Sequence, residues 1–169
     1  MTLREDIQSE DMSLVLKGLD DLEVKLRQKH DYSDLLDSLV NLSVSDNSAI
    51  IRKVTWCAAK MGQNKINDLR IISLLASLAN SDDEQVRENV AWGIGETAGT
   101  VALNNNSINA ISLLLDDPER DVRGMAAWAA GRFHRKCGYI TDEIKTKLKT
   151  LLEDPSEYVR SAAKFALEI

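Results

Sequence analysis

The sequence contains little of what builds strands or disulfide frameworks. Only 5% of its 169 residues are aromatic, and it has just two prolines and two cysteines. Because strands favour β-branched and aromatic side chains, this composition favours helices. The cysteines, Cys57 and Cys137, lie far apart in sequence and form no CxxC pair, which indicates reduced thiols in a cytoplasmic protein.

Long apolar runs are missing as well. The first ten residues, MTLREDIQSE, are acidic and include no apolar segment of the kind found in signal peptides. No stretch of about 18 apolar residues occurs, so the sequence predicts no membrane-spanning helix. We therefore expect a cytoplasmic protein with no membrane partner.

Candidate catalytic and metal-binding residues are scarce. His134 and Cys137 are three residues apart, but a zinc site needs more ligands than these two. No third group is evident that would orient a Cys–His nucleophile, and there is no phosphate-binding glycine loop and no GxSxG motif. The sequence therefore predicts no catalytic residue, no metal and no cofactor.

The net charge of −6 resides entirely in the N-terminal part of the chain. Residues 1–46 hold eleven acidic and five basic side chains, whereas residues 47–169 hold sixteen of each. An acidic field repels phosphate backbones and attracts basic partners, although simple solubility is an alternative reason for such a charge. We expect a basic protein partner and no nucleic acid.

Four segments with a shared pattern recur along the chain. They read IIRKVTWCAAKMG from residue 50, QVRENVAWGIGETAG from 85, DVRGMAAWAAGRF from 121 and YVRSAAKFALEI from 158. Successive anchor arginines are 35, 36 and 37 residues apart; they are Arg52, Arg87, Arg123 and Arg160. Each segment follows an apolar stretch whose leucines and isoleucines recur every three or four residues, which is the helical period. Each unit is thus a helix A, a short turn and a helix B.

The pattern V-R-x-x-A-A-x-A-L-G resembles the HEAT repeat, in the short form of the phycobilisome-lyase-like group. It reads VRENVAWGIG at 86–95, VRGMAAWAAG at 122–131 and VRSAAKFALE at 159–168. The copy at 51–60, IRKVTWCAAK, departs from it, with Trp56 where alanine is usual and Lys60 where glycine is usual. Tetratricopeptide repeats have a similar period, but their Trp/Leu-Gly/Tyr signature is missing.

The resemblance, which covers residues 31–169, implies an all-α, right-handed α–α superhelix. We expect a single domain over 1–169, with repeats at 31–64, 65–102, 103–138 and 139–169. An acidic cap at 1–30 would contain one amphipathic helix over 10–29. The resemblance also implies a structural ladder in which arginines pair with turn aspartates of adjacent repeats; its members would be Arg87, Arg123, Arg160, Asp83, Asp117 and Asp154.

The helical wheel of helix B identifies a column that faces away from the core. At about 100° per residue, positions −1, +3, +4 and +7 from the anchor arginine share the core side, and position +5 lies opposite. In HEAT solenoids the B helices line the concave face. We therefore predict a partner-binding surface made of Lys53, Cys57, Lys60, Glu88, Trp92, Glu96, Trp128, Arg132 and Phe165. Packing of the same aromatic rings over the neighbouring B helix is the alternative.

These features favour a protein-binding module over an enzyme. The most concrete hypothesis is an acidic immunity or inhibitor protein, monomeric alone and heterodimeric with a basic, nuclease-type bacterial toxin. A scaffold or chaperone subunit of a larger complex is the alternative. HEAT-like enzymes, namely bilin lyases and DNA glycosylases, are less favoured, because the chain lacks a catalytic constellation and a basic groove.

Overall fold

The computed structural model describes residues 2–168, which form ten α-helices and one 3-10 helix. These are α1 (Leu3–Ile7), α2 (Met12–Arg27), η1 (Ser33–Leu35), α3 (Leu36–Leu42), α4 (Ser48–Gln63), α5 (Leu69–Ser77), α6 (Glu84–Glu96), α7 (Asn105–Leu114), α8 (Arg120–Cys137), α9 (Asp142–Leu151) and α10 (Glu157–Leu167). This part of the chain holds no strand, only an isolated bridge between Ala98 and Val101. None of its helices is long and apolar enough to cross a bilayer.

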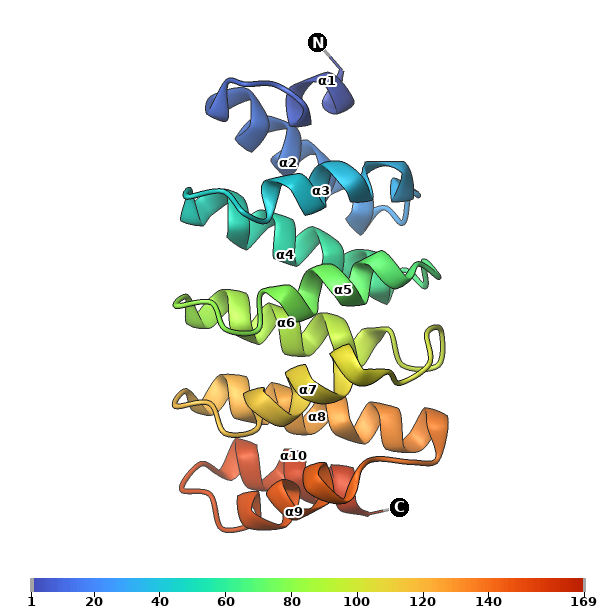
Figure 1. The fold of residues 1–169 in the computed structure, drawn as a ribbon, viewed down its shortest axis with the longest axis vertical. Coiled ribbons are helices and arrows are strands. Elements are labelled where there is room, and N and C mark those ends of the chain that lie inside the picture. The colour runs from blue at the N-terminus through green and yellow to red at the C-terminus, as the bar shows by residue number, and fades with distance from the viewer. Residues whose placement is uncertain (1, 169) are drawn as a thin grey trace.

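The helices form two layers that advance along one axis, with the N- and C-terminal ends at opposite ends of the stack (Figure 1). The B helices α4, α6, α8 and α10 pack side by side in chain order, and the A helices α3, α5, α7 and α9 cover one side of them. Each repeat contacts its immediate neighbours, as expected for a solenoid. The predicted all-α solenoid of two-helix repeats is therefore confirmed.

Small residues set the close spacing of the B helices. A Cβ atom built on Gly93 of α6 would lie 2.7 Å from the Cβ of Ala59 and 2.8 Å from its Cα, both on α4. The alanines of the repeat pattern, such as Ala91, Ala127 and Ala163, are also fully buried. Glycine costs a helix about 1 kcal/mol relative to alanine. Here it allows one helix to approach the backbone of the next, which a larger residue would prevent.

The N-terminal cap is a pair of helices rather than the single helix that the sequence predicts. Helix α2 lies within the predicted range and packs against α4, with Val15, Leu19 and Leu22 fully buried. Helix α1 precedes it and packs on it, and Asp6 of α1 is buried in an ion pair with Lys17 of α2 at 2.6 Å. The cap therefore repeats the A–B layout of the solenoid with a very short first helix.

Candidate functional site

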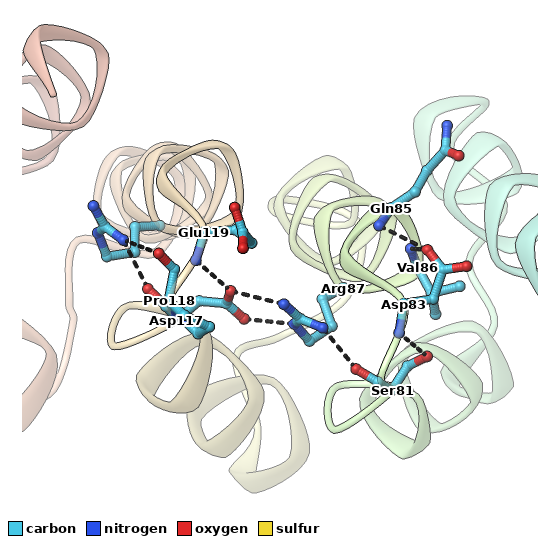
Figure 2. Close-up of polar contacts among 9 residues, drawn as sticks. Ser81, Asp83, Gln85, Val86, Arg87, Asp117, Pro118 and Glu119 are labelled. Atoms are coloured by element: carbon cyan, nitrogen blue, oxygen red, sulfur yellow. Dashed lines mark hydrogen bonds and ion pairs between the residues drawn. The ribbon is translucent and has the colours of Figure 1, made fainter.

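A ladder of arginine–aspartate pairs joins the B helices to the turns of the next repeats. The Nε of Arg87 donates to Oδ2 of Asp117 at 2.7 Å and its Nη2 to Oδ1 at 3.0 Å, while Nη1 donates to the Ser81 carbonyl at 2.8 Å (Figure 2). Arg123 makes the same pair with Asp154, at 2.8 and 3.1 Å. Each arginine thus holds its own turn and the following one, so this cluster has a structural role.

The two ends of the ladder differ from the predicted set. Arg52 is not a predicted member of the ladder, but it pairs with Asp83 at 2.5 Å. Arg160 donates to the carbonyls of Asp154 and Pro155, and it forms no ion pair with a carboxylate among residues 2–168. The aspartates also order their own turns: Asp83 is the N-cap of α6, accepting from Gln85 N and Val86 N, whereas Asp117 accepts from Glu119 N.

We expect acid to weaken this ladder. The hydrogen bonds from Arg123 hold the pKa of Asp154 below its ordinary value. A carboxylate with a lowered pKa in the folded state stabilises the fold above its unfolded pKa, near 3.9, and loses that contribution as the pH falls through the lower value. Chemical unfolding of the wild type and of Asp154→Asn should therefore differ most at neutral pH, and the difference should shrink between about pH 5 and about pH 2. A difference that is constant over this window would contradict the prediction.

Three of the four side chains at position +5 of the B helices lie on one partly exposed surface, which we call the B-helix face. Trp92, Trp128 and Phe165 are each partly exposed. The rings also pack between repeats: a Cβ on Gly95 would lie 2.5 Å from the Trp128 ring, and one on Gly131 would lie 2.5 Å from the Phe165 ring. Each of these rings therefore covers the preceding B helix with one part and meets solvent with another.

Cys57, the fourth member of the predicted column, does not reach the surface. Its side chain is fully buried, and its burial raises the pKa of the thiol. Helix α2 packs against α4 and covers this position, so Cys57 cannot contact a partner. The prediction for Cys57 is wrong because the wheel described one helix alone and took no account of the helix packed on it.

In this repeat the partly exposed side chain is Trp56, the residue before Cys57. Its ring is partly exposed, its centroid lies 6.2 Å from that of Trp92, and the guanidinium of Arg27 lies 4.5 Å from it. The wheel assigned position +4 to the core, where the next two repeats place the buried alanines Ala91 and Ala127. A tryptophan is far larger than the space that an alanine fills between helices, and this size difference was the available signal.

Most of the predicted charged residues are partly exposed but already paired within the chain. Lys53 pairs with Asp20 and Glu23, and Lys60 donates to Gln63. Glu96 accepts from the Trp92 indole at 3.3 Å and lies 3.7 Å from Arg132, whose guanidinium lies 5.6 Å from the centroid of the Trp128 ring. The contacts of Glu96 and Arg132 help to hold the rings of Trp92 and Trp128 in place.

Glu88 differs from them. No lysine or arginine among residues 2–168 lies within ion-pair distance of it. Burial raises its pKa, and the nearby carboxylates of Asp121 and Glu84 raise it further. Glu88 is therefore a partly buried acid that lies near other acids and lacks a cation.

An apolar pocket of about 380 Å³ opens between α6, α8 and α10 on the B-helix face. Four rings line it, together with Met125 and Ala162; they belong to Trp92, Trp128, Tyr158 and Phe165. Tyr158 is 44% exposed and lies across α8 at Gly124, where an added Cβ would come within 2.1 Å of its ring. Tyr158 and Met125 are not among the predicted site residues, because neither falls at position +5 of its B helix.

Comparison with known proteins supports the repeat assignment. A family model described as HEAT repeats matches residues 71–168. Comparison with curated protein sequences gives no match. Among solved structures, a designed armadillo repeat protein in complex with peptide (KR)4 is similar, with a TM-score of 0.70, 18% identity and coverage of 98% of this chain and 79% of that one.

Two further solved structures are also similar to this chain. An engineered protein has a TM-score of 0.74 and 19% identity, with coverage of 99% of this chain and 78% of that one. A computationally designed armadillo repeat protein for modular peptide recognition has a TM-score of 0.68 and 18% identity, with coverage of 98% and 79%. At these identities the similarity shows a shared fold and carries no function with it.

Proposed function

This chain belongs to the HEAT-repeat family, and on that premise we propose that it is a protein-binding module whose partner docks on the B-helix face. The observation that carries the proposal is the row of partly exposed aromatic rings around the apolar pocket. Rings of this kind are typical anchors of protein interfaces, where truncating one costs about 2 kcal/mol or more of binding free energy. A binding role of this kind requires no catalytic residue.

The charge of the chain supports a basic partner. Its net charge is −6, and the excess acids belong to residues 1–46, which include α1 and α2 at the end of the stack. Such a field steers a positively charged protein toward the module and speeds association. The similar designed protein in complex with peptide (KR)4 provides a precedent for basic peptides on this fold.

The sharper form of the proposal is an immunity or inhibitor protein that neutralises a basic, nuclease-type bacterial toxin in a one-to-one complex. A nuclease must present a basic cleft to the phosphate backbone, and an acidic module that covers this cleft would block it. A scaffold or chaperone subunit of a larger complex uses the same kind of surface and is the alternative. The two differ in whether the partner's activity falls when the module binds.

A double variant tests the B-helix face. Trp92→Ala combined with Trp128→Ala is expected to weaken the binding of partners captured from native lysate, by at least about tenfold, because it removes two interface anchors. Partners are identified by mass spectrometry, and the affinity of the purified partner is measured by calorimetry. Tyr139→Ala is the matched control, since Tyr139 is an exposed ring in the loop between α8 and α9, outside the pocket.

Two outcomes would contradict parts of the proposal. Unchanged affinity in a double variant that retains its helical content would remove the B-helix face as the site. Recovery of acidic partners alone would remove the inhibitor hypothesis. If a basic nuclease is captured, its cleavage of DNA or RNA should fall when one equivalent of the wild-type module is added, and undiminished cleavage in the complex would favour the scaffold.

A further inference from the structure

Arginine guanidinium groups lie over several aromatic rings of this protein. The guanidinium of Arg27 lies 4.5 Å from the Trp56 ring centroid, that of Arg132 lies 5.6 Å from Trp128, and that of Arg135 lies 4.0 Å from Phe165. A guanidinium stacks on an aromatic face through its attraction to the π-electrons, and it keeps its outward N–H groups free for hydrogen bonds. Three rings of the B-helix face are thus covered by cations from the chain itself.

Two of the rings that line the pocket, those of Trp92 and Tyr158, have no such cation over them among residues 2–168. Both rings line the pocket of about 380 Å³, which is large enough for one side chain of a partner. They are therefore the places on this face where a cation from another molecule can stack.

Two acidic side chains lie one helical turn from residues that line this pocket. Glu88 is one helical turn before Trp92 on α6, and Asp121 is one turn before Met125 on α8. Burial raises the pKa of the Tyr158 hydroxyl, and the charges of Glu88 and Asp121 raise it further. The pocket thus has apolar aromatic walls and a negative rim.

The rim lacks a strong cationic partner of its own. Glu88 forms no ion pair within residues 2–168, and Asp121 meets only Arg120, an adjacent and largely exposed side chain at 3.4 Å. Like charges held close together oppose folding, and an arriving cation relieves that repulsion. The charge pattern therefore favours a positive ligand over a neutral or acidic one.

We propose that this pocket binds an arginine side chain from a basic segment of the protein partner. The guanidinium stacks between Trp92 and Tyr158 and donates hydrogen bonds to Glu88 and Asp121. An arginine fits better than a lysine, because its planar group stacks on rings and presents several donors in a fork. This inference rests on the proposed function and names the chemistry that the B-helix face recognises.

Indole resonances of the protein provide the test. The chain has three tryptophans, whose indole N–H signals are assigned with single Trp→Phe variants. On titration with the capped tripeptide acetyl-Gly-Arg-Gly-amide, we expect the Trp92 and Trp128 signals to shift clearly more than that of Trp56, which lies beside Trp92 but outside the pocket. The citrulline analogue, which has the same shape without the charge, should bind at least tenfold more weakly, and the lysine tripeptide should bind more weakly than the arginine one.

A charge-neutral variant checks the rim. Glu88→Gln combined with Asp121→Asn keeps the size of both side chains and should weaken arginine binding at least tenfold. Asp20→Asn combined with Asp21→Asn removes two charges from α2, far along the stack, and should leave arginine binding nearly unchanged (Figure 1). Equal weakening by both double variants would show that net charge alone attracts the probe, and it would overturn the inference.

The remaining outcomes separate this inference from the proposed function. If arginine moves no tryptophan signal while Trp92→Ala and Trp128→Ala still weaken partner binding, the arginine pocket is wrong and the binding face stands. If the Trp92 and Trp128 signals shift with protein concentration alone, a second copy of the chain fills the pocket, and the inference fails. If the arginine tripeptide binds as expected but the partner binds the Trp92→Ala, Trp128→Ala variant as tightly as the wild type, the proposed function at this face fails.

Discussion

Replacing Asp117 with alanine is expected to lower the free energy of unfolding by about 3 kcal/mol, the low end for breaking one partner of a buried ion pair. The side chains of Asp117 and Arg87 are 5% and 13% exposed. Without the Asp117 carboxylate, the Arg87 guanidinium would stay charged and largely buried. The turn would also lose the bond from Glu119 N to Asp117. Urea unfolding followed by circular dichroism measures the effect.

An exposed ion pair that joins α1 to η1 offers a matched control for this variant. Arg4 and Asp34 form a pair with nearly the same geometry, at 2.8 and 3.2 Å, but their side chains are 51% and 55% exposed. Because water screens such a pair, Asp34→Ala should cost less than about 1 kcal/mol. Equal losses from the two variants would show that burial of the ladder does not add to its stabilising effect.

The second large effect is expected from Gly93→Val, which should destabilise the protein by about 2–3 kcal/mol through overpacking. Even the first added carbon would lie 2.7 Å from Ala59 Cβ and 2.7 Å from Leu75 Cδ1. The clash with Ala59 also involves its Cα, so the backbones of α4 and α6 would have to separate. The thermal unfolding midpoint and the urea midpoint should both fall.

An exposed alanine on the neighbouring helix controls for the cost of valine itself. Ala49 lies in α4 and faces solvent, so Ala49→Val adds a β-branched residue without a clash. Helix propensity predicts a loss of about 0.5 kcal/mol. A loss at Gly93 no larger than the loss at Ala49 would mean that the spacing of the B helices is not set by contact at Gly93.

Periodicity made the repeat architecture predictable, because the arginine anchors and the alanines behind them recur at almost constant spacing. Each repeat has to bury the same stripe against the next, so the spacing of the pattern reports the stacking directly. The N-terminal pair of helices was harder to predict. Helix α1 is only five residues long, and it is held by burial against α2 and by the Asp6–Lys17 pair rather than by a periodic pattern.

The candidate site was only partly predictable for a related reason. The wheel placed Trp92, Trp128 and Phe165 on an exposed face from the geometry of one helix. It misplaced Cys57 and Trp56, because α2 lies over the first and a tryptophan cannot fit in the space of an alanine. Tyr158 joins the pocket only because α10 passes beside Gly124 of α8, a contact between helices that no single-helix pattern contains.

The sequence alone therefore determined the class of fold, the number of repeats, the positions of the anchor arginines and the acidic balance that favours a basic partner. These properties depend on residue type and on spacing along one helix, both of which can be read from the chain. Only the tertiary structure decided which arginine meets which aspartate, which rings remain partly exposed, and that Tyr158 joins Trp92 and Trp128 around one apolar pocket. Those features come from neighbouring helices, whose relative rotation and distance are set by packing across repeats.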